Sequence, residues 1–202
     1  MQIFIVEISP RIYSFIEHLG HDPLLLTYPV RFKDRCVFQY SRLKMLRVCK
    51  IRPESEHSLE EFEKALAWFQ FNFIQDFSYT SRDGLSALDM PWMGETLCNL
   101  ENILSGYVTD EYYPSFEGFS HETVDSMISE LTYRMHQFAN LHGMVHNDLF
   151  AGAPNNILFL PGTTYLSIID PEAFVTLSDY SWNTFVQHIR QVHEYMHDFL
   201  CQ

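Results

Sequence analysis

The order of apolar and polar residues predicts strands in the first part of the chain. The segments expected here are a strand or arm at residues 1–8, a short helix at 10–19, and strands at 24–30, 36–40 and 43–51. Lys33 and Asp34 give the turn of a hairpin between strands, and Pro53 ends the last strand.

A helix is predicted after these strands. Its apolar positions recur at spacings of three and four residues, which is the period of one helical face, and they are Leu59, Phe62, Leu66, Phe69 and Phe73. Ser58 and Glu61 have the spacing of a capping box, in which two side chains accept hydrogen bonds from free backbone N–H groups. We therefore expect Ser58 to cap the start of this helix.

The rest of the chain changes from strands to long helices. We expect strands at 77–80 and 85–90 around an Arg82-Asp83-Gly84 turn, a short helix at 96–104, a loop at 105–120, a long helix through 124–142 ending at Gly143, strands at 157–160 and 165–169, and a helix at 183–200. This order predicts an α+β fold. We divide it into a sheet-rich domain with one long helix, residues 1–92, and a mainly helical domain, residues 93–202.

Composition and charge exclude several classes of function. The 202 residues are 47% apolar and carry a formal net charge of −13. Such a chain can bury a core, and its charge repels nucleic-acid phosphates and anionic membrane surfaces. No apolar run approaches the ~20 residues of a membrane span, and the first residues lack the basic region of a secretory signal. We expect a cytoplasmic protein, or one delivered into a host cytosol if it is an effector.

The four cysteines argue against a cysteine-based metal or redox site. Cys36, Cys49, Cys98 and Cys201 lie far apart, without a Cys-x-x-Cys spacing, so neither a zinc knuckle nor a redox pair is expected. Cys36 and Cys49 lie in strand-like runs and are expected to be buried thiols.

One stretch of the chain suits metal and phosphate chemistry. His146, Asp148 and Asn156 lie in a polar loop after the long helix. Asp170 and Glu172 follow the second strand of a hairpin, and because a hairpin joins its outer ends, Asn156 and Asp170 are expected to be neighbours. Carboxylate and amide oxygens are ligands that Mg²⁺ prefers, usually together with substrate phosphates. A separate aspartate such as Asp148 can orient and deprotonate an acceptor hydroxyl.

With these residues the sequence resembles the protein-kinase-like superfamily, nearest the branch of aminoglycoside phosphotransferases and choline, fructosamine and methylthioribose kinases. That branch has a catalytic loop of the form His-Gly/Asn-Asp-Leu-x-x-x-Asn-Ile-Leu and a metal motif Ile-Asp-Phe/Pro-Glu; the matching residues here are His146-Asn-Asp-Leu149, Asn156-Ile-Leu158 and Ile169-Asp-Pro-Glu172. The resemblance implies a two-lobed fold with a truncated helical C-lobe, and ATP and Mg²⁺ as cofactors. Asp148 is the implied catalytic base, and Asn156, Asp170 and Glu172 are the implied metal ligands, with Asn155 as a competitor of Asn156.

The resemblance also implies a nucleotide site upstream. Lys50 would bind the α- and β-phosphates, and Val48, on the same face of the strand, would cover the adenine. A glutamate of the following helix should pair with Lys50. Glu61 is assigned to the capping box, and we choose Glu63 because it lies one turn from both Leu59 and Leu66, at the border of the buried face. A solvated glutamate is the alternative, since Glu60, Glu61 and Glu63 are clustered.

The resemblance also implies a hinge between the two lobes, which would lie where the second domain begins. The backbone near Met90 and Met93 would face the adenine. Lys50, Asp148 and Asp170 are then expected to converge on one cleft.

The sequence departs from the family pattern in four ways. No Gly-x-Gly-x-x-Gly loop precedes Lys50, and Asp148 and Asn156 are eight residues apart, which is longer than in the family. Asn147 replaces the arginine of ordinary protein kinases, so control by a phosphorylated activation loop is not expected. Only 30 residues follow Glu172, so much of the helical acceptor-binding lobe is expected to be missing.

Three classes of function follow from the sequence. The first is an ATP- and Mg²⁺-dependent phosphotransferase acting on a hydroxyl acceptor, a small molecule or a protein. The second is a pseudokinase that serves as a nucleotide- or protein-binding regulatory module, and the third is an α+β protein unrelated to kinases. No motif identifies the acceptor. Acidic residues within 105–122 suit a cationic substrate, and a solvated loop is the alternative reading.

Overall fold

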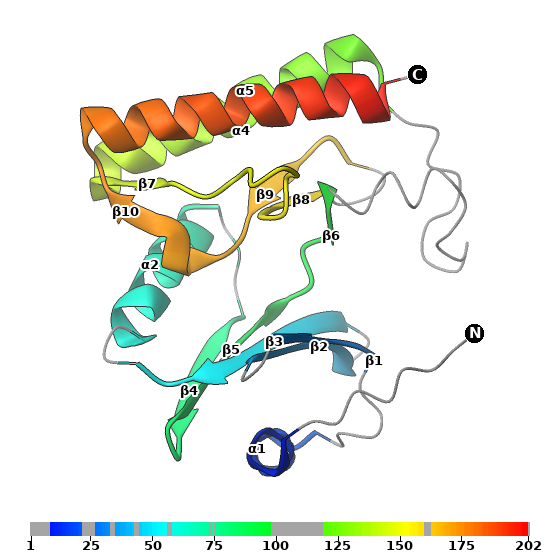
Figure 1. Ribbon diagram of the computed structural model, residues 1–202, viewed down its shortest axis with the longest axis vertical. Coiled ribbons are helices and arrows are strands. Elements are labelled where there is room, and N and C mark those ends of the chain that lie inside the picture. Colours follow the sequence, from blue (N-terminus) through cyan, green and yellow to red (C-terminus); the bar gives the residue numbers. More distant parts are fainter. Residues whose placement is uncertain are drawn as a thin grey trace. The chain divides into compact units, whose positions relative to one another are not determined.

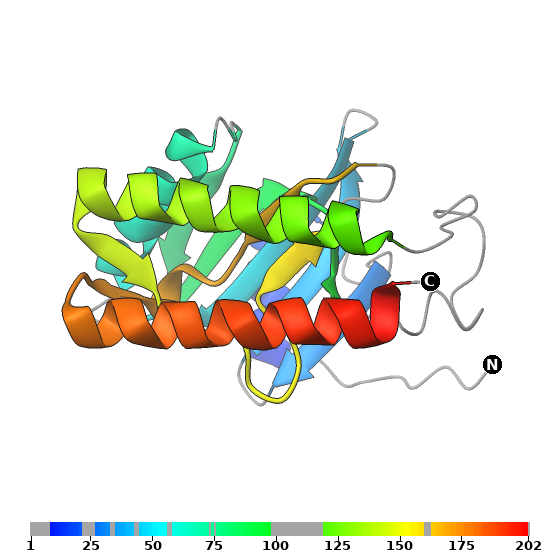
Figure 2. The same cartoon turned by 90° about the horizontal axis from the view of Figure 1, so that it is seen from above.

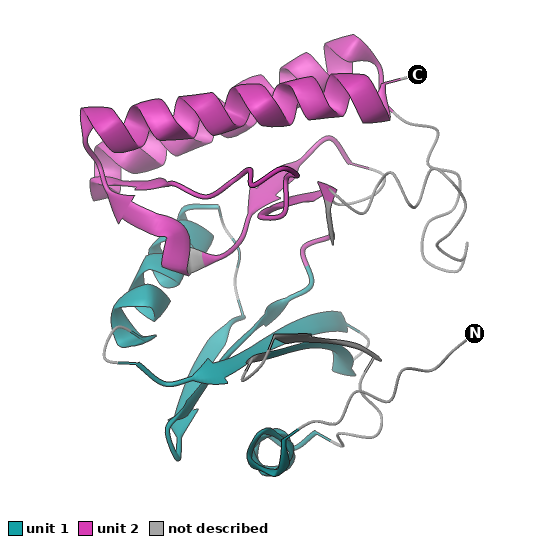
Figure 3. Ribbon diagram, in the orientation of Figure 1, with its two compact units in different colours: residues 1–92 teal, residues 93–202 magenta. Residues whose placement is uncertain are grey.

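The computed structural model describes residues 9–21, 27–32, 35–42, 45–55, 58–72, 74, 76–97, 119–159 and 163–201. The strand or arm expected at 1–8, Cys98 and most of the segment 96–120 lie outside these ranges. The chain divides into two compact units, residues 1–92 and 93–202 (Figure 3).

Unit 1 (residues 1–92) is an antiparallel sheet with two helices (Figure 1). Its elements are α1 (Pro10–His18), β1 (Thr27–Phe32), β2 (Arg35–Arg42), β3 (Met45–Pro53), α2 (Ser58–Phe71), β4 (Ser78–Arg82) and β5 (Leu85–Pro91). The strand order is β1-β2-β3-β5-β4. Phe32 pairs with Arg35, which confirms the predicted hairpin, and residues 24–26 of the expected strand lie outside the described residues.

The two faces of this sheet are covered by different helices. Along β3 buried and half-buried side chains alternate. One face packs on α1 in a core of Ile12, Phe15, Ile16, Cys36, Phe38, Cys49, Ile51, Leu85 and Ala87. Cys36 and Cys49 are therefore buried thiols, as predicted, and burial raises the pKa of Cys49. On the other face, the α2 side chains of Phe62 and Glu61 contact Tyr79 of β4 and Arg52 of β3.

The start of α2 differs from the predicted capping box. Ser58 is buried in the first turn, and its Oγ accepts a hydrogen bond from the backbone N–H of Ser55 at 2.9 Å. Glu61 forms an ion pair with Arg52 instead. The sequence contains two overlapping spacings, Ser55-x-x-Ser58 and Ser58-x-x-Glu61. The ion pair with Arg52 on β3 takes Glu61 away from the second one.

The buried face of α2 also differs from the expected one. Ala65, Trp68 and Phe69 are buried, whereas Leu59 is 59% exposed. The buried face of the helix includes Trp68, its largest side chain. Leu59, the first of the predicted apolar positions, points to solvent. Phe73 lies outside the described residues.

The turn between β4 and β5 forms where it was predicted. Asp83 and Gly84 both have positive φ, 52° and 69°. A two-residue hairpin turn of this type requires left-handed backbone at both positions, which Asp tolerates and Gly adopts freely.

Unit 2 (residues 93–202) contains a long helix pair and short strands. Its elements are β6 (Glu95–Thr96), α4 (His121–His142), β7 (Met144–His146), β8 (Ile157–Phe159), β9 (Leu166–Ile168), the 3₁₀ turn η2 (Pro171–Ala173), β10 (Phe174–Thr176) and α5 (Asp179–Leu200). The strands form a β6-β8-β9 sheet and a β10-β7 pair. Strand β6 overlaps the helix expected from residue 96, because Thr96 pairs with Leu158 of β8.

The two long helices lie side by side (Figure 2). Ser120 caps the start of α4, and Gly143 ends it with left-handed backbone at φ 65°, as predicted. Helix α5 begins at Asp179, four residues before the expected start, because Ser178 and Ser181 form a reciprocal capping box. None of the described helices combines the length and apolar character needed to cross a membrane.

Candidate functional site

His146 joins the two motifs of the candidate site. It ends β7 and is fully buried. Its Nε2 lies 3.0 Å from the carbonyl oxygen of Ile169 and 3.1 Å from that of Asp170, while its Nδ1 accepts a hydrogen bond from the backbone N–H of Asp148 at 3.3 Å. Two carbonyl acceptors at Nε2 and a donor at Nδ1 assign the neutral tautomer with its proton on Nε2.

The burial of His146 keeps this imidazole neutral. Loss of solvation lowers its pKa to about 4, against weaker opposing effects of the Asp170 and Ile169 carbonyls. Its ring also packs edge-on against Phe174 of β10, with centroids 5.0 Å apart. His146 is therefore a positioning residue, which ties the backbone of Asp148 to that of Asp170.

The loop from Asp148 to Asn156 is long, but its ends stay together. Asn156 Nδ2 donates to the carbonyl oxygen of Asp148 at 2.6 Å and lies 3.4 Å from its Oδ2. The extra residues form a bulge, in which Gly152 has φ 83° and Ala153 accepts hydrogen bonds from the backbones of Ala151 and Asn155. The side chain of Asp148 is exposed and that of Asn156 is partly buried.

The β8-β9 hairpin places Asn156 beside the metal motif, as its spacing predicts. Ile157 pairs with Ile168, and the N–H of Ile169 donates to the carbonyl oxygen of Asn156 at 3.0 Å. Asp170 follows directly, so the two predicted metal ligands come from neighbouring backbone positions at the open end of this hairpin.

Asp170 has an unusual backbone. Its φ is 73°, in the left-handed region that non-glycine residues seldom adopt and that costs of order 1 kcal/mol or more. The turn is held because Ala173 N–H donates to the Asp170 carbonyl oxygen at 3.1 Å and Asn147 N–H to that of Ala173 at 2.9 Å. Such strain, fixed by surrounding bonds, is typical of functional positions. Glu172 lies in this turn and is partly buried.

Two contacts of this arrangement were not predicted from the sequence. Strand β10 pairs with β7, with Phe174 opposite His146, and so ties the metal motif to the catalytic loop. His188 of α5 accepts a hydrogen bond from the backbone N–H of Leu149 at 3.3 Å through Nδ1. A three-residue strand has too little periodicity to be detected, and a lone histidine in a helix carries no motif.

In unit 1 the predicted nucleotide residues share one face of the sheet. Val48 pairs with Met90, and Lys50 pairs with Leu88, so these four side chains lie on the same side of β3 and β5. Val48 and Lys50 are partly buried and Met90 is buried. Met93, the first residue of unit 2, is partly buried as well.

The glutamate assignment changes with the start of α2. Glu63 is exposed, whereas Glu61 pairs with Arg52, which lies on the same face of β3 as Lys50. Glu61 was set aside because it was assigned to the capping box, and that assignment is wrong. Glu63 stays a prediction, and Glu61 is again a candidate beside it.

Comparison with known proteins identifies the fold. No protein-family model and no curated protein sequence matches the chain. Among solved structures it is similar to the Cydia pomonella granulovirus kinase PK-1, with a TM-score of 0.56 and 16% identity over 85% of this chain. The chain spans 61% of the length of that viral kinase, and at this identity the likeness concerns the fold alone. The chain therefore has a protein-kinase-like fold, which confirms the expected fold class.

Proposed function

We propose that this chain is an ATP- and Mg²⁺-dependent phosphotransferase, of the branch that includes aminoglycoside phosphotransferases and small-molecule kinases, and that it acts on a hydroxyl acceptor. The observation that carries the proposal is the bonding of His146 to Asp148 on one side and to Ile169 and Asp170 on the other. It holds a candidate base and a candidate metal ligand in one framework of partly buried hydrogen bonds.

The oxygen donors of this framework fit Mg²⁺. Because Asn156 Nδ2 is bonded to the Asp148 carbonyl oxygen, Asn156 Oδ1 is the atom that can serve as a ligand. Together with the carboxylates of Asp170 and Glu172 it makes a set of hard oxygen ligands. Bound there, Mg²⁺ would neutralise charge on the β- and γ-phosphates. Asn155 is exposed and its N–H bonds within the bulge, which favours Asn156 for this role.

Asp148 is the proposed base. Its exposed carboxylate can accept the proton of an acceptor hydroxyl. The hydroxyl oxygen then forms a bond to the γ-phosphorus, and the bond from that phosphorus to the bridging oxygen breaks, so that ADP leaves with the electron pair. The hydrogen bond from Asn156 fixes the backbone of Asp148 at the start of the loop. This orients the Asp148 carboxylate before the acceptor binds.

Residues of unit 1 take the nucleotide roles in this proposal. Lys50 binds the α- and β-phosphates, and Val48 and Met90 contact the adenine from the same sheet face, with the backbone near Met93 as the hinge. Glu61 or Glu63 supports the lysine, and the contact of Glu61 with Arg52 favours Glu61. The acceptor is a small molecule or a protein.

A pseudokinase is the second candidate, and the long bulge favours it. Asn156 lies eight residues after Asp148, and Ala151 and Gly152 of the bulge between them are exposed. No glycine-rich loop precedes Lys50. A chain of this kind would bind a nucleotide or a protein partner without transferring phosphate.

Two measurements on the wild-type chain separate these functions. The first is the melting temperature with and without Mg-ATP, since a ligand that binds only the folded state stabilises it by RT ln(1 + [L]/Kd). The second is ADP release from Mg-ATP with a panel of alcohols, amine-bearing alcohols and proteins. We expect both a thermal shift and acceptor-dependent ADP release. A rise in melting temperature with Mg-ATP but no ADP release with any acceptor supports the pseudokinase. A melting temperature that no nucleotide changes, with Mg²⁺ or with another divalent metal present, contradicts the phosphotransferase.

A further inference from the structure

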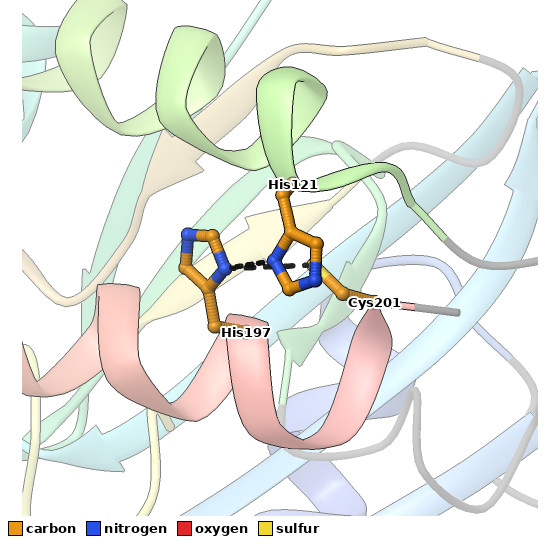
Figure 4. Close-up of side chains that lie close together, drawn as sticks. All are labelled: His121, His197 and Cys201. Carbon is orange, nitrogen blue, oxygen red and sulfur yellow. Dashed lines mark hydrogen bonds between the residues drawn. The ribbon is translucent and has the colours of Figure 1, made fainter.

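Metal-ligating side chains gather at one end of the α4-α5 pair. His121 and Asp125 belong to the first turns of α4, His193 and His197 to the last turns of α5, and Cys201 directly follows α5. Figure 4 shows His121 and His197 facing one another, with Cys201 beside them. None of these residues belongs to the proposed phosphotransfer site.

The helix pairing brings these groups together. The backbone N–H of Phe119 donates to the carbonyl oxygen of Leu200 at 2.9 Å, and Phe119 also pairs with Cys201, so the start of α4 is fixed beside the end of α5. A spacing of four residues places His193 and His197 on one face of α5. Their rings lie with centroids 4.3 Å apart, and Asp125 reaches them from α4.

Three donor atoms converge in a nearly equilateral triangle. Asp125 Oδ1 lies 2.7 Å from His193 Nε2 and 3.0 Å from His197 Nε2, and the two imidazole nitrogens are 2.9 Å apart. Each of these atoms can offer a lone pair to a metal when it carries no proton, so the triangle is held either by shared protons or by a cation. Tetrahedral zinc with bonds of about 2.0–2.1 Å separates its ligand atoms by about 3.3–3.4 Å. Small outward rotations of these side chains make that room.

The other nitrogen of His197 is also engaged. Its Nδ1 lies 3.9 Å from Cys201 Sγ and in hydrogen-bond contact with Nδ1 of His121, whose ring is stacked on it. A ligating histidine usually has its second ring nitrogen bonded to a partner, which fixes the tautomer and the direction of the ring. His121 and Cys201 occupy that position for His197.

Charge and access both suit a metal ion. The carboxylate of Asp125 adds a negative charge to the two imidazoles at neutral pH. Side chains of Asp125, His193 and His197 are 60%, 38% and 22% exposed, which leaves the triangle open to solvent. Two imidazoles with one carboxylate select zinc and neighbouring transition metals over Mg²⁺ and Ca²⁺, which take oxygen ligands.

We propose that Asp125, His193 and His197 bind one Zn²⁺ ion, with the fourth position open to water, and that this ion ties the start of α4 to the end of α5. The inference is independent of the phosphotransferase proposal. The spacing of the cysteines excluded a zinc knuckle, but the ligands here are histidines and an aspartate brought together by helix packing.

Isothermal titration with Zn²⁺ on the chelator-treated full chain tests the proposal. We expect one Zn²⁺ per wild-type chain, bound in the presence of excess Mg²⁺. Asp125→Asn, His193→Gln and His197→Gln should each weaken binding by at least about 100-fold, since loss of even a supporting partner costs 10–100-fold. His136→Gln, which removes an exposed histidine of α4 outside the cluster, should bind like wild type. Stoichiometric binding that survives His193→Gln, or no binding by wild type, would overturn the proposal.

A Co²⁺ titration identifies the ligands. The proposed site predicts tetrahedral visible bands without a thiolate-to-cobalt charge-transfer band, and an unchanged spectrum in Cys201→Ser. It also predicts a melting temperature that Zn²⁺ raises in wild type and in Cys201→Ser but not in His193→Gln. A thiolate band that disappears in Cys201→Ser would place the ion at the other nitrogen of His197, with His121 and Cys201, and would overturn the assignment.

Discussion

The Nε2 atom of His146 lies 3.0 Å from the carbonyl oxygen of Ile169, and this contact holds the metal motif against the catalytic loop. The same nitrogen is shared with Asp170, and the opposite ring nitrogen receives the N–H of Asp148. One buried neutral imidazole therefore bonds to backbone groups of two separate segments, at Asp148 and at Ile169–Asp170.

His146→Phe should destabilise the fold by about 2–4 kcal/mol, because the ring can still pack on Phe174 while buried carbonyl and N–H groups lose their partner. Urea unfolding gives the free energy. His142→Phe, at an exposed position of α4, serves as the control and should change stability by less than about 0.5 kcal/mol. Equal losses in the two variants would show that the hydrogen bonds of His146 contribute little.

The lowered pKa of His146 predicts a pH dependence of stability. The folded chain binds this proton only near pH 4, whereas an unfolded histidine binds it near pH 6.5. Between these values the unfolded state holds more protons, so the free energy of unfolding falls as pH falls, by about 3 kcal/mol in all. His146→Gln keeps a donor for the carbonyls but does not titrate. Its free energy of unfolding, measured from about pH 7 to pH 4.5, should fall less steeply than that of wild type, and parallel curves would contradict this.

Arg47 is a buried cation in unit 1. Its side chain is 3% exposed and binds Asp89 through Nε at 2.6 Å and Asp76 through Nη1 at 2.6 Å. Arg47→Met should cost about 3–5 kcal/mol of unfolding free energy, since it leaves a partly buried Asp89 without its cation. Lys64→Met removes a helical i,i+4 pair with Glu60 and should cost under about 1 kcal/mol. Similar costs would show that the Arg47 network is not a major source of stability.

Asp170→Asn should abolish Mg-nucleotide binding and leave the fold intact. Asparagine tolerates left-handed backbone about as well as aspartate, so the φ of 73° adds no new strain. Glu172→Gln should only weaken binding, because it replaces a second carboxylate ligand. Calorimetry with Mg-ATP measures both, with urea unfolding as the control for folding. Unchanged affinity in Asp170→Asn would remove this residue from the metal site.

The sequence predicted the contacts that follow from chain order. A hairpin must join its outer ends, so the neighbourhood of Asn156 and Asp170 could be inferred from spacing. Contacts chosen by packing could not be inferred. Spacing offers Glu61 a capping bond at Ser58, whereas its ion pair with Arg52 depends on the position of β3. The contact of His188 with Leu149, the pairing of β10, and the meeting of Asp125 with His193 and His197 depend on packing between distant segments, which leaves no local signal.

The most direct test of the phosphotransferase is turnover in Asp148→Ala compared with wild type. The account predicts that wild type transfers the γ-phosphoryl group to a hydroxyl acceptor, that the variant loses about 10²–10⁴-fold in turnover, and that both bind Mg-ATP equally, because a base acts on the acceptor and not on the nucleotide. If wild type binds Mg-ATP but shows no more turnover than Asp148→Ala, the result would contradict the phosphotransferase proposal and favour the pseudokinase.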